Sequence, residues 1–316
     1  MRRALLVGIN HYPKSPLNGC INDANRMHEV FATHENGNPN FSCKRLTSDK
    51  IEVTRGYLRK KIEDLFNHRD NDTTLLYFSG HGATTKAGTY LVTQDGEPND
   101  YGVSLMEIVA LANSSVAKEV IIILDCCYAG DAGNSIDLGE RKVVLREGVS
   151  ILAASTDKQY SYEKSGGGIF TNIIYDAMQG SAADLRGKIN LSSLYYFADT
   201  QLDAWQQRPL FKSHVSQMIS LRNCEPKIPL DILRKLPQYF SDTKTGLQLS
   251  VNFLKTEDTN NLKLQKVMEH LHLYHTNGLL QLTTAKTLEA AAQKNEACTL
   301  TPLGNYYKKL ALSKKI

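Results

Sequence analysis

The chain has 316 residues, of which 41% are hydrophobic and 22% are charged, and its formal net charge is +4. This composition is typical of a globular protein with enough apolar residues to bury the core of an enzyme-sized domain. It excludes a membrane span, because no segment approaches the roughly 18 continuous apolar residues that a span needs.

The first apolar run, residues 4–9, follows two arginines and ends at the polar residues Asn10 and His11. It is too short for the apolar region of a signal peptide, so it predicts a buried strand. The six cysteines are irregularly spaced and form no pair of C-x-x-C motifs. We therefore expect reduced thiols, no structural zinc and a cytoplasmic location.

Short unbroken apolar runs predict strands that are covered on both faces, as in a parallel sheet. They are residues 4–9, 73–79, 120–125 and 149–153. Amphipathic patterns between and after them predict helices at residues 23–31, 58–66, 105–112, 170–178 and 191–206. This alternation predicts a doubly wound α/β sheet flanked by helices, in which functional residues follow the carboxyl ends of the strands.

The pattern breaks at residues 223–229, which contain Pro226 and Pro229. We place a domain boundary there, so that residues 1–222 form the first domain and residues 223–316 form the second. From Glu225 onward the chain has 13 Lys or Arg against 8 Asp or Glu, which makes the second domain basic.

The second domain is predicted to be small and mostly helical. Apolar residues from Leu264 to Tyr274 share one helical face, and Gly278 sits where that helix would end. A short strand at residues 279–282, an alanine-rich helix at 288–293, the segment 298–300 and a basic helix from about Pro302 complete the pattern. This order resembles a winged-helix unit.

Two residues with reactive side chains follow predicted strands. His81 lies between Gly80 and Gly82, and Cys127 follows the run that ends at Asp125; each is expected on a tight turn. A thiol with its ordinary pKa of about 8.5 holds few thiolates at neutral pH, so a nearby imidazole is needed to take its proton. The same imidazole then protonates a leaving amine. The N–H groups of Gly82 and Cys127 are candidates for an oxyanion hole, because a glycine lets a substrate approach the backbone.

Further motifs occur in a fixed order around this pair. They are Leu-Val-Gly-Ile-Asn at 6–10, Leu-Asn-Gly-Cys-Ile-Asn-Asp-Ala at 17–24, Ser-Gly-His-Gly at 79–82, Asp-Cys-Cys-Tyr-Ala-Gly at 125–130, Ser-Thr-Asp-Lys-Gln at 155–159 and Gly-Gly-Gly-Ile-Phe-Thr at 166–171. Together they resemble the caspase and metacaspase cysteine peptidases, including prokaryotic caspase-like proteases. The resemblance spans most of residues 4–220 and implies a caspase-like fold. It also implies that Cys127, not Cys126, is the nucleophile and that His81 is the base. Taken singly, a histidine or a cysteine is more often a packing residue.

The resemblance also implies an acidic pocket for the residue that precedes the cleaved bond. The family residues that form it match Cys20, Asp23, Ser79 and Asp125, and such a pocket accepts Arg or Lys. Caspases instead hold an aspartate with arginines, which the matched positions lack. Other interpretations stay open, since Asp23 and Asp125 could cap helices and Cys20 could serve packing alone.

The chain departs from the metacaspase pattern at two places. Tyr128 and Ala129 replace the usual His-Ser after the nucleophile. Residues 83–88 contain no cluster of aspartates, so we expect no calcium dependence. We also expect no other metal site and no cofactor.

The segment 130–147 is polar and contains three glycines. In the families that the chain resembles, the matching segment is an exposed linker that is cut during activation. Arg141, Lys142 and Arg146 are therefore candidate sites of self-cleavage, although their charges could equally serve to solvate a surface loop.

The sequence thus predicts a cysteine endopeptidase that cleaves protein substrates after Arg or Lys through an acyl-enzyme thioester. The resemblance further implies a regulated effector of cell death or antiviral defence, with the second domain linking it to a sensor or activator. Two alternatives remain. One is an inactive homologue that acts as a scaffold, and the other is an effector recruited to nucleic acid by the basic second domain.

Overall fold

The computed structural model describes residues 1–70, 72–86, 88–98, 100–129, 144–154, 166–202, 209–241, 246–254 and 261–316, without the side chains of residues 127–129. The described chain packs as two compact units. Unit 1 comprises Met1–Ala183 and Lys188–Cys224, and unit 2 comprises Asp184–Gly187 and Glu225–Ile316.

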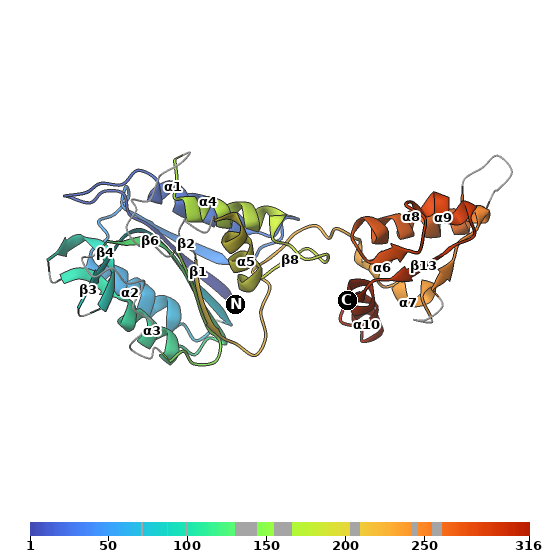
Figure 1. Ribbon diagram of the computed structural model, residues 1–316. Coiled ribbons are helices and arrows are strands. Elements are labelled where there is room, and N and C mark those ends of the chain that lie inside the picture. The colour runs from blue at the N-terminus through green and yellow to red at the C-terminus, as the bar shows by residue number, and fades with distance from the viewer. Residues whose placement is uncertain are drawn as a thin grey trace. The chain divides into compact units, whose positions relative to one another are not determined.

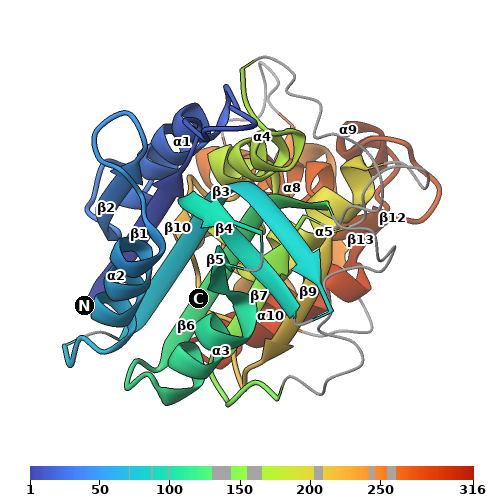
Figure 2. The ribbon, with the colours of Figure 1, turned by 90° about the vertical axis from the view of Figure 1, so that its left-hand side faces the viewer.

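Unit 1 is built on one mixed sheet (Figure 1). In order across the sheet, the strands of its main path are β2 (Ser42–Thr47), β1 (Arg2–Gly8), β3 (Thr73–Thr85), β6 (Glu119–Ala129), β7 (Val149–Ala153) and β9 (Leu210–His214). All neighbours on this path are parallel except β9, which is antiparallel to β7. The antiparallel strands β4 (Gly88–Glu97) and β5 (Asp100–Ser104) continue from the end of β3 (Figure 2).

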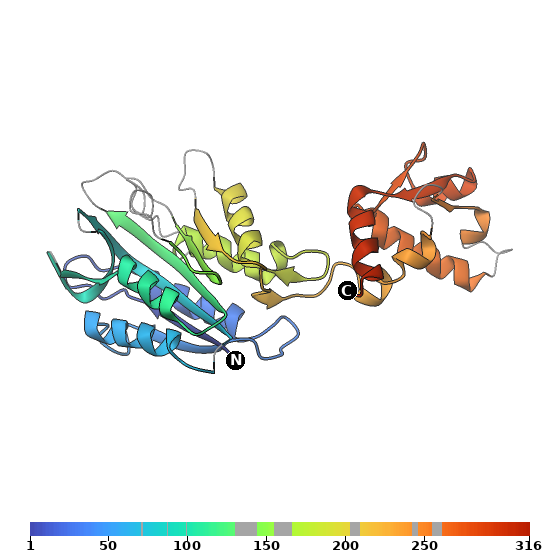
Figure 3. The ribbon, with the colours of Figure 1, turned by 90° about the horizontal axis from the view of Figure 1, so that it is seen from below.

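Helices cover both faces of this sheet (Figure 3). One face packs against α2 (Arg55–Phe66) and α3 (Leu105–Ser114), and the other against α1 (Cys20–Ala32), α4 (Ile169–Asp176) and α5 (Leu191–Gln201). Along β3, Leu76 and Phe78 join the first core, whereas Leu75 and Tyr77 join the second. Because alternate residues of one strand are buried on opposite faces, the central strands have the unbroken apolar runs seen in the sequence.

The structure corrects the expectation that His81 and Cys127 lie on tight turns. Strands β3 and β6 run past the predicted ends at residues 79 and 125, so that both residues lie inside strands. The reason is pairing: β3 and β6 stay in register as far as Ala83 and Ala129, and β4 pairs with the last residues of β3. A glycine on each side of a histidine favours a turn, but it does not prevent an extended strand that has partners on both sides.

The remaining predicted helices of unit 1 are present with shifted ends. The helix expected at residues 170–178 ends as α4 at Asp176 and continues as the π-helical turn η1 (Ala177–Ser181). The helix expected at residues 191–206 is α5, which ends at Gln201. A small antiparallel pair, β8 (Lys188–Ile189) with β10 (Arg222–Asn223), completes the unit.

Unit 2 has its own core, to which Phe240, Leu271, Tyr274 and Cys298 belong. Its elements are α6 (Leu230–Leu233), α7 (Leu236–Tyr239), β11 (Leu247–Gln248), η2 (Val251–Phe253), α8 (Leu262–Thr276), β12 (Leu280–Leu282), α9 (Leu288–Gln293), β13 (Ala297–Leu300) and α10 (Pro302–Leu312). The three strands form an antiparallel sheet in the order β11-β13-β12. The predicted elements from α8 to α10 are all present, while the winged-helix assignment stays a prediction. Within the described ranges, no helix combines the length and hydrophobicity that crossing a membrane requires.

Candidate active site

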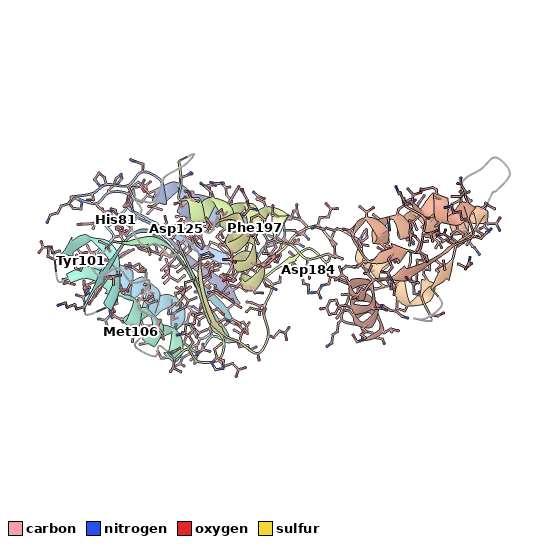
Figure 4. All side chains as sticks on the ribbon, viewed as in Figure 1. His81, Tyr101, Met106, Asp125, Asp184 and Phe197 are labelled. Atoms are coloured by element: carbon pink, nitrogen blue, oxygen red, sulfur yellow. The ribbon has the colours of Figure 1, made fainter. Side chains whose placement is uncertain are left out.

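The two predicted reactive residues occupy neighbouring positions in the sheet. In the parallel ladder between β3 and β6, His81 is the Cα partner of Cys127 and Ser79 is the Cα partner of Asp125. Adjacent strands are about 4.8 Å apart, so each pair is separated by one strand spacing. Figure 4 labels His81 and Asp125, which come from these two neighbouring strands.

The imidazole of His81 is oriented by a backbone carbonyl. Its Nε2 lies 2.7 Å from the carbonyl oxygen of Ser15. Because a carbonyl only accepts hydrogen bonds, Nε2 carries the proton when the ring is neutral, and Nδ1 is then the basic nitrogen. This tautomer gives His81 a nitrogen that can accept a proton.

Tyr12 holds the backbone and the ring of His81. The backbone N–H of His81 donates to Oη of Tyr12 at 3.0 Å, and the two rings lie 4.6 Å apart between centroids. The Tyr12 hydroxyl in turn donates to the carbonyl oxygen of Val92 at 3.2 Å. A Cβ on Gly80 would lie only 2.5 Å from Oη of Tyr12, which explains the glycine before His81. The sequence places Tyr12 shortly after the first strand, where functional residues are expected, but it indicates no role for this side chain.

The two adjacent cysteines have different surroundings. Cys126 is 2% exposed and belongs to the core that packs against α2 and α3. Cys127 is described as a backbone position beside His81, and its side chain lies outside the described part of the structure. The oxyanion-hole candidate Gly82 lies in β3 between Leu91 of β4 and Tyr128 of β6.

Asp23 is a buried carboxylate at the end of the sheet. It lies in the first turn of α1 and is 1% exposed. Its Oδ2 accepts a hydrogen bond from Oγ of Ser79 at 2.9 Å, and the N–H of Gly168 lies 3.2 Å from both of its oxygens. Helix α1 begins at Cys20, and Oδ1 of Asn10 accepts from the N–H of Ile21 at 3.2 Å. Asp23 therefore does not cap its own helix.

Asp125 lies within β6 and is held from α4. The N–H of Thr171 donates to its Oδ2 at 3.1 Å, and the Thr171 hydroxyl donates to the same oxygen. The glycines before α4 pass directly over both carboxylates. A Cβ on Gly167 would lie 2.5 Å from Oδ1 of Asp23, and one on Gly168 would lie 2.3 Å from Oδ2 of Asp125. This close approach accounts for the glycines at 167 and 168, whereas Gly166 meets no neighbour and has a φ of +78°.

Both acids have a raised affinity for protons. Burial, and then the charge of Asp125, raise the pKa of Asp23 to about 7. Burial also raises the pKa of Asp125, against the two hydrogen bonds from Thr171, which lower it. At neutral pH the pair therefore retains part of a proton, and a bound cation would displace that proton.

The remaining predicted residues fall at different places. Cys20 is buried at the start of α1, where its carbonyl faces Gly8, and the pocket and packing roles both remain open. Arg141 and Lys142 lie outside the described residues. Arg146 is held firmly: its Nη2 donates to the carbonyl oxygen of Ala117 at 2.6 Å, and its Nε donates to that of Ala112 at 3.3 Å.

The described residues contain no group of three or more His, Cys, Asp or Glu side chains that could hold a metal ion. Of the segment after His81, Ala83 to Thr85 form the end of β3 and pair with β4. The described site combines an imidazole beside position 127 with the carboxylates of Asp23 and Asp125.

Comparison with known proteins gives a consistent result. A family model described as the caspase domain matches residues 1–220. Metacaspase-1 of Plasmodium falciparum is 28% identical over 204 residues, which are 53% of this chain and 32% of that protein. Metacaspase-4 of Arabidopsis thaliana is 25% identical over 210 residues, which are 59% of this chain and 45% of that protein. The chain thus spans less than half the length of these curated relatives.

Solved structures share the fold at lower sequence similarity. Caspase-1 of Spodoptera frugiperda has a TM-score of 0.51 and 14% identity, over 71% of this chain and 90% of that chain. A protein of Geobacter sulfurreducens also has a TM-score of 0.51, with 18% identity over 71% of this chain and 97% of that chain. These similarities show the fold alone.

Proposed function

The chain belongs to the caspase domain family of cysteine peptidases, and from this premise we propose that it is an endopeptidase that cleaves proteins after Arg or Lys. In this proposal Cys127 is the nucleophile and His81 is the general base. The observation that carries it is the strand register, which makes His81 and Cys127 neighbours at the same end of the sheet as the buried Asp23 and the half-buried Asp125. The reacting pair then comes from adjacent strands, and the proposed specificity pocket comes from β6 and from helix α1.

The proposed reaction follows from the tautomer of His81. Nδ1 accepts the thiol proton of Cys127, and the thiolate attacks the carbonyl carbon of the scissile peptide bond. The N–H groups of Gly82 and Cys127 stabilise the oxyanion. The imidazolium then returns the proton to the leaving amine, which yields a thioester, and water activated by His81 hydrolyses the thioester and restores the thiol. The Ser15 carbonyl keeps the ring in the required orientation throughout.

The proposed preference for Arg or Lys depends on Asp23 and Asp125. A cationic side chain that meets Asp23 and Asp125 replaces the proton held there and forms charge-assisted hydrogen bonds. An aspartate side chain would instead add a third negative charge to the pocket, which is unfavourable. The chain should therefore cleave as its metacaspase relatives are expected to, and not as caspases do.

The test is cleavage of a peptide library by the full chain, with the products identified by mass spectrometry. Cleavage after Arg or Lys is the expected result, and efficient cleavage after Asp would contradict the proposal. Asp125→Ala should reduce turnover of an arginine peptide at least tenfold, because leaving a buried charge unpaired costs about 2–5 kcal/mol. Asp49→Ala, which removes an exposed carboxylate, is the matched control.

Regulation through unit 2 is the second part of the proposal. The segment from Glu225 onward carries the excess of basic residues, which supports binding to an acidic protein surface of an activator or, alternatively, to nucleic acid. Retardation of duplex DNA with a steep dependence on salt would favour nucleic acid. Unchanged DNA mobility, together with protein-dependent activation, would favour a sensor protein in the proposed setting of cell death or antiviral defence.

A further inference from the structure

The hydroxyl of Thr171 lies between two other polar groups in the core. Its Oγ1 is 2.5 Å from Oη of Tyr77, and it also contacts Oδ2 of Asp125. The side chains of Tyr77 and Thr171 are both fully buried. These three groups therefore form a chain of hydrogen bonds that leads from β3 through α4 to the pocket.

The direction of these hydrogen bonds follows from a count of protons. The Thr171 hydroxyl donates its single proton to Oδ2 of Asp125. The Tyr77 hydroxyl must then donate to Oγ1 of Thr171. Burial raises the pKa of Tyr77 well above its usual value, so this phenol keeps its proton. The chain of hydrogen bonds is thus arranged for an ionised Asp125.

One oxygen of Asp125 is fully used by these contacts. Oδ2 accepts both the N–H and the hydroxyl of Thr171. Among the residues that the structure describes, no hydrogen bond reaches Oδ1. The orientation of the carboxylate therefore leaves Oδ1 as the oxygen that can meet a cationic ligand.

We propose that Thr171, supported by Tyr77, is a positioning residue that determines specificity, because its hydroxyl orients Asp125 and stabilises its ionised form for an arginine or lysine side chain. This inference rests on the proposed function of the pocket. It adds that selectivity for a cation depends on a hydroxyl in α4 that need not touch the substrate. Without that hydroxyl, Asp125 should keep its proton to higher pH and bind the cation less well.

Other ionisable groups face this pocket and must be held constant in a test. Asp23, Arg26 and Cys20 come from α1, and Tyr77 comes from β3. Burial and the charge of Asp125 raise the pKa of Asp23, whereas the positive charge of Arg26 lowers it. Since none of these residues changes in a Thr171 variant, a shift in the pH dependence would report on the hydroxyl.

The experiment compares Thr171→Val with Thr171→Ser in the full chain, using a peptide with arginine before the cleaved bond. We expect Thr171→Val to raise KM about tenfold while kcat changes less than about twofold, as for loss of one charge-assisted hydrogen bond. The midpoint of the KM–pH profile should move to higher pH. Thr171→Ser keeps the hydroxyl and should restore both values, and Tyr77→Phe should shift the same midpoint by a smaller amount.

Thr74→Val is the matched control, because Thr74 is also a fully buried threonine and its hydroxyl has no hydrogen-bond partner within the described residues. Its KM and pH profile should equal those of the wild type.

A second peptide with citrulline in place of arginine tests charge selectivity, and Thr171→Val should leave the weak cleavage of this peptide unchanged. The inference would be overturned if Thr171→Val had the KM and the pH midpoint of the wild type. It would also be overturned if Thr171→Val and Thr171→Ser raised the KM by the same factor.

A binding measurement separates this inference from the proposed function. Agmatine, a small guanidinium ligand, is titrated into the wild type and Thr171→Val by calorimetry. Weaker agmatine binding in Thr171→Val would support the inference even if no peptide is cleaved, in which case only the peptidase proposal fails. Equal agmatine binding by both proteins would overturn the inference even if arginine peptides are cleaved normally.

Discussion

His81 and Cys127 are Cα partners in the parallel ladder between β3 and β6, one strand spacing apart. Cys126 is the Cα partner of Gly80, and its side chain is buried in the core between the sheet and helices α2 and α3. Only one of two adjacent cysteines can face the imidazole, because successive residues of a strand point to opposite faces of the sheet. The strand register thus bears directly on which of the two cysteines reacts.

The first prediction is that Cys127→Ala abolishes peptidase activity whereas Cys126→Ala leaves most of it. The first change removes the proposed nucleophile, and the second removes a small buried side chain with a modest cost in stability of about 1 kcal/mol. Initial rates with an arginine peptide, together with thermal unfolding of both variants, measure this difference. Activity that survives in Cys127→Ala and disappears in Cys126→Ala would reverse the assignment.

The strands of the inner sheet were predictable because they are buried on both faces and therefore apolar throughout. The polar edge strand β2 and the hairpin of β4 and β5 were not predicted. Lys44 and Arg45 interrupt the apolar pattern in β2, and Gln94 and Asp95 interrupt it in β4. An exposed face allows such residues, so the composition of an edge strand carries a weaker signal.

Some residues of the site were identifiable from sequence motifs, whereas others become apparent only in the folded structure. His81, Asp23 and Asp125 were identified from motifs, because chemistry restricts the residue type at these positions. Tyr12 and Thr171 act through one hydroxyl each, and a tyrosine or a threonine occurs at many positions for packing alone. Their partners lie 69 and 46 residues away along the chain, so only the folded structure brings these groups together.

The second prediction concerns the dependence of stability on pH. The pKa of Asp23 is about 7 in the folded chain, against 3.8 for an unperturbed aspartate. The folded state therefore binds the proton more tightly, and stability is lost as the pH rises from about 4 toward 7. The Asp23→Asn variant has no carboxyl group to ionise at this position, so it does not lose this stability as the pH rises. Its Tm should therefore exceed that of the wild type at pH 8. At that pH the difference in unfolding free energy should be on the order of a few kcal/mol.

The check is a series of thermal unfolding curves from pH 5 to pH 8 for both proteins. The gap in Tm should widen as the pH rises, while the variant loses activity toward arginine peptides. Asp49→Asn, at an exposed position, is the control for the loss of a charge. A gap that stays constant across this range would show that Asp23 is ionised throughout.

The third prediction is that peptide cleavage does not require calcium. Calcium needs six to eight oxygen ligands, and Ala83, Thr84 and Thr85 after His81 offer no carboxylate. Initial rates should therefore be equal within error in excess chelator and in millimolar calcium. Activity that vanishes in chelator and returns with calcium would contradict this prediction.

The last prediction is that the active enzyme cuts its own chain after Arg141 or Lys142. Both have the cationic side chain that the proposed pocket accepts, and both lie in a polar, glycine-containing segment of the kind that proteases reach. Arg146 is the weaker candidate, because carbonyl oxygens of Ala112 and Ala117 already bind its guanidinium and would have to release it. Incubation of wild type and Cys127→Ala, followed by sequencing of new N-termini, measures the outcome. New ends after Arg141 or Lys142 should appear in the wild type alone, and replacing both residues by glutamine should prevent them. A wild-type chain that remains intact while it turns over peptide would show that activity does not depend on this cleavage.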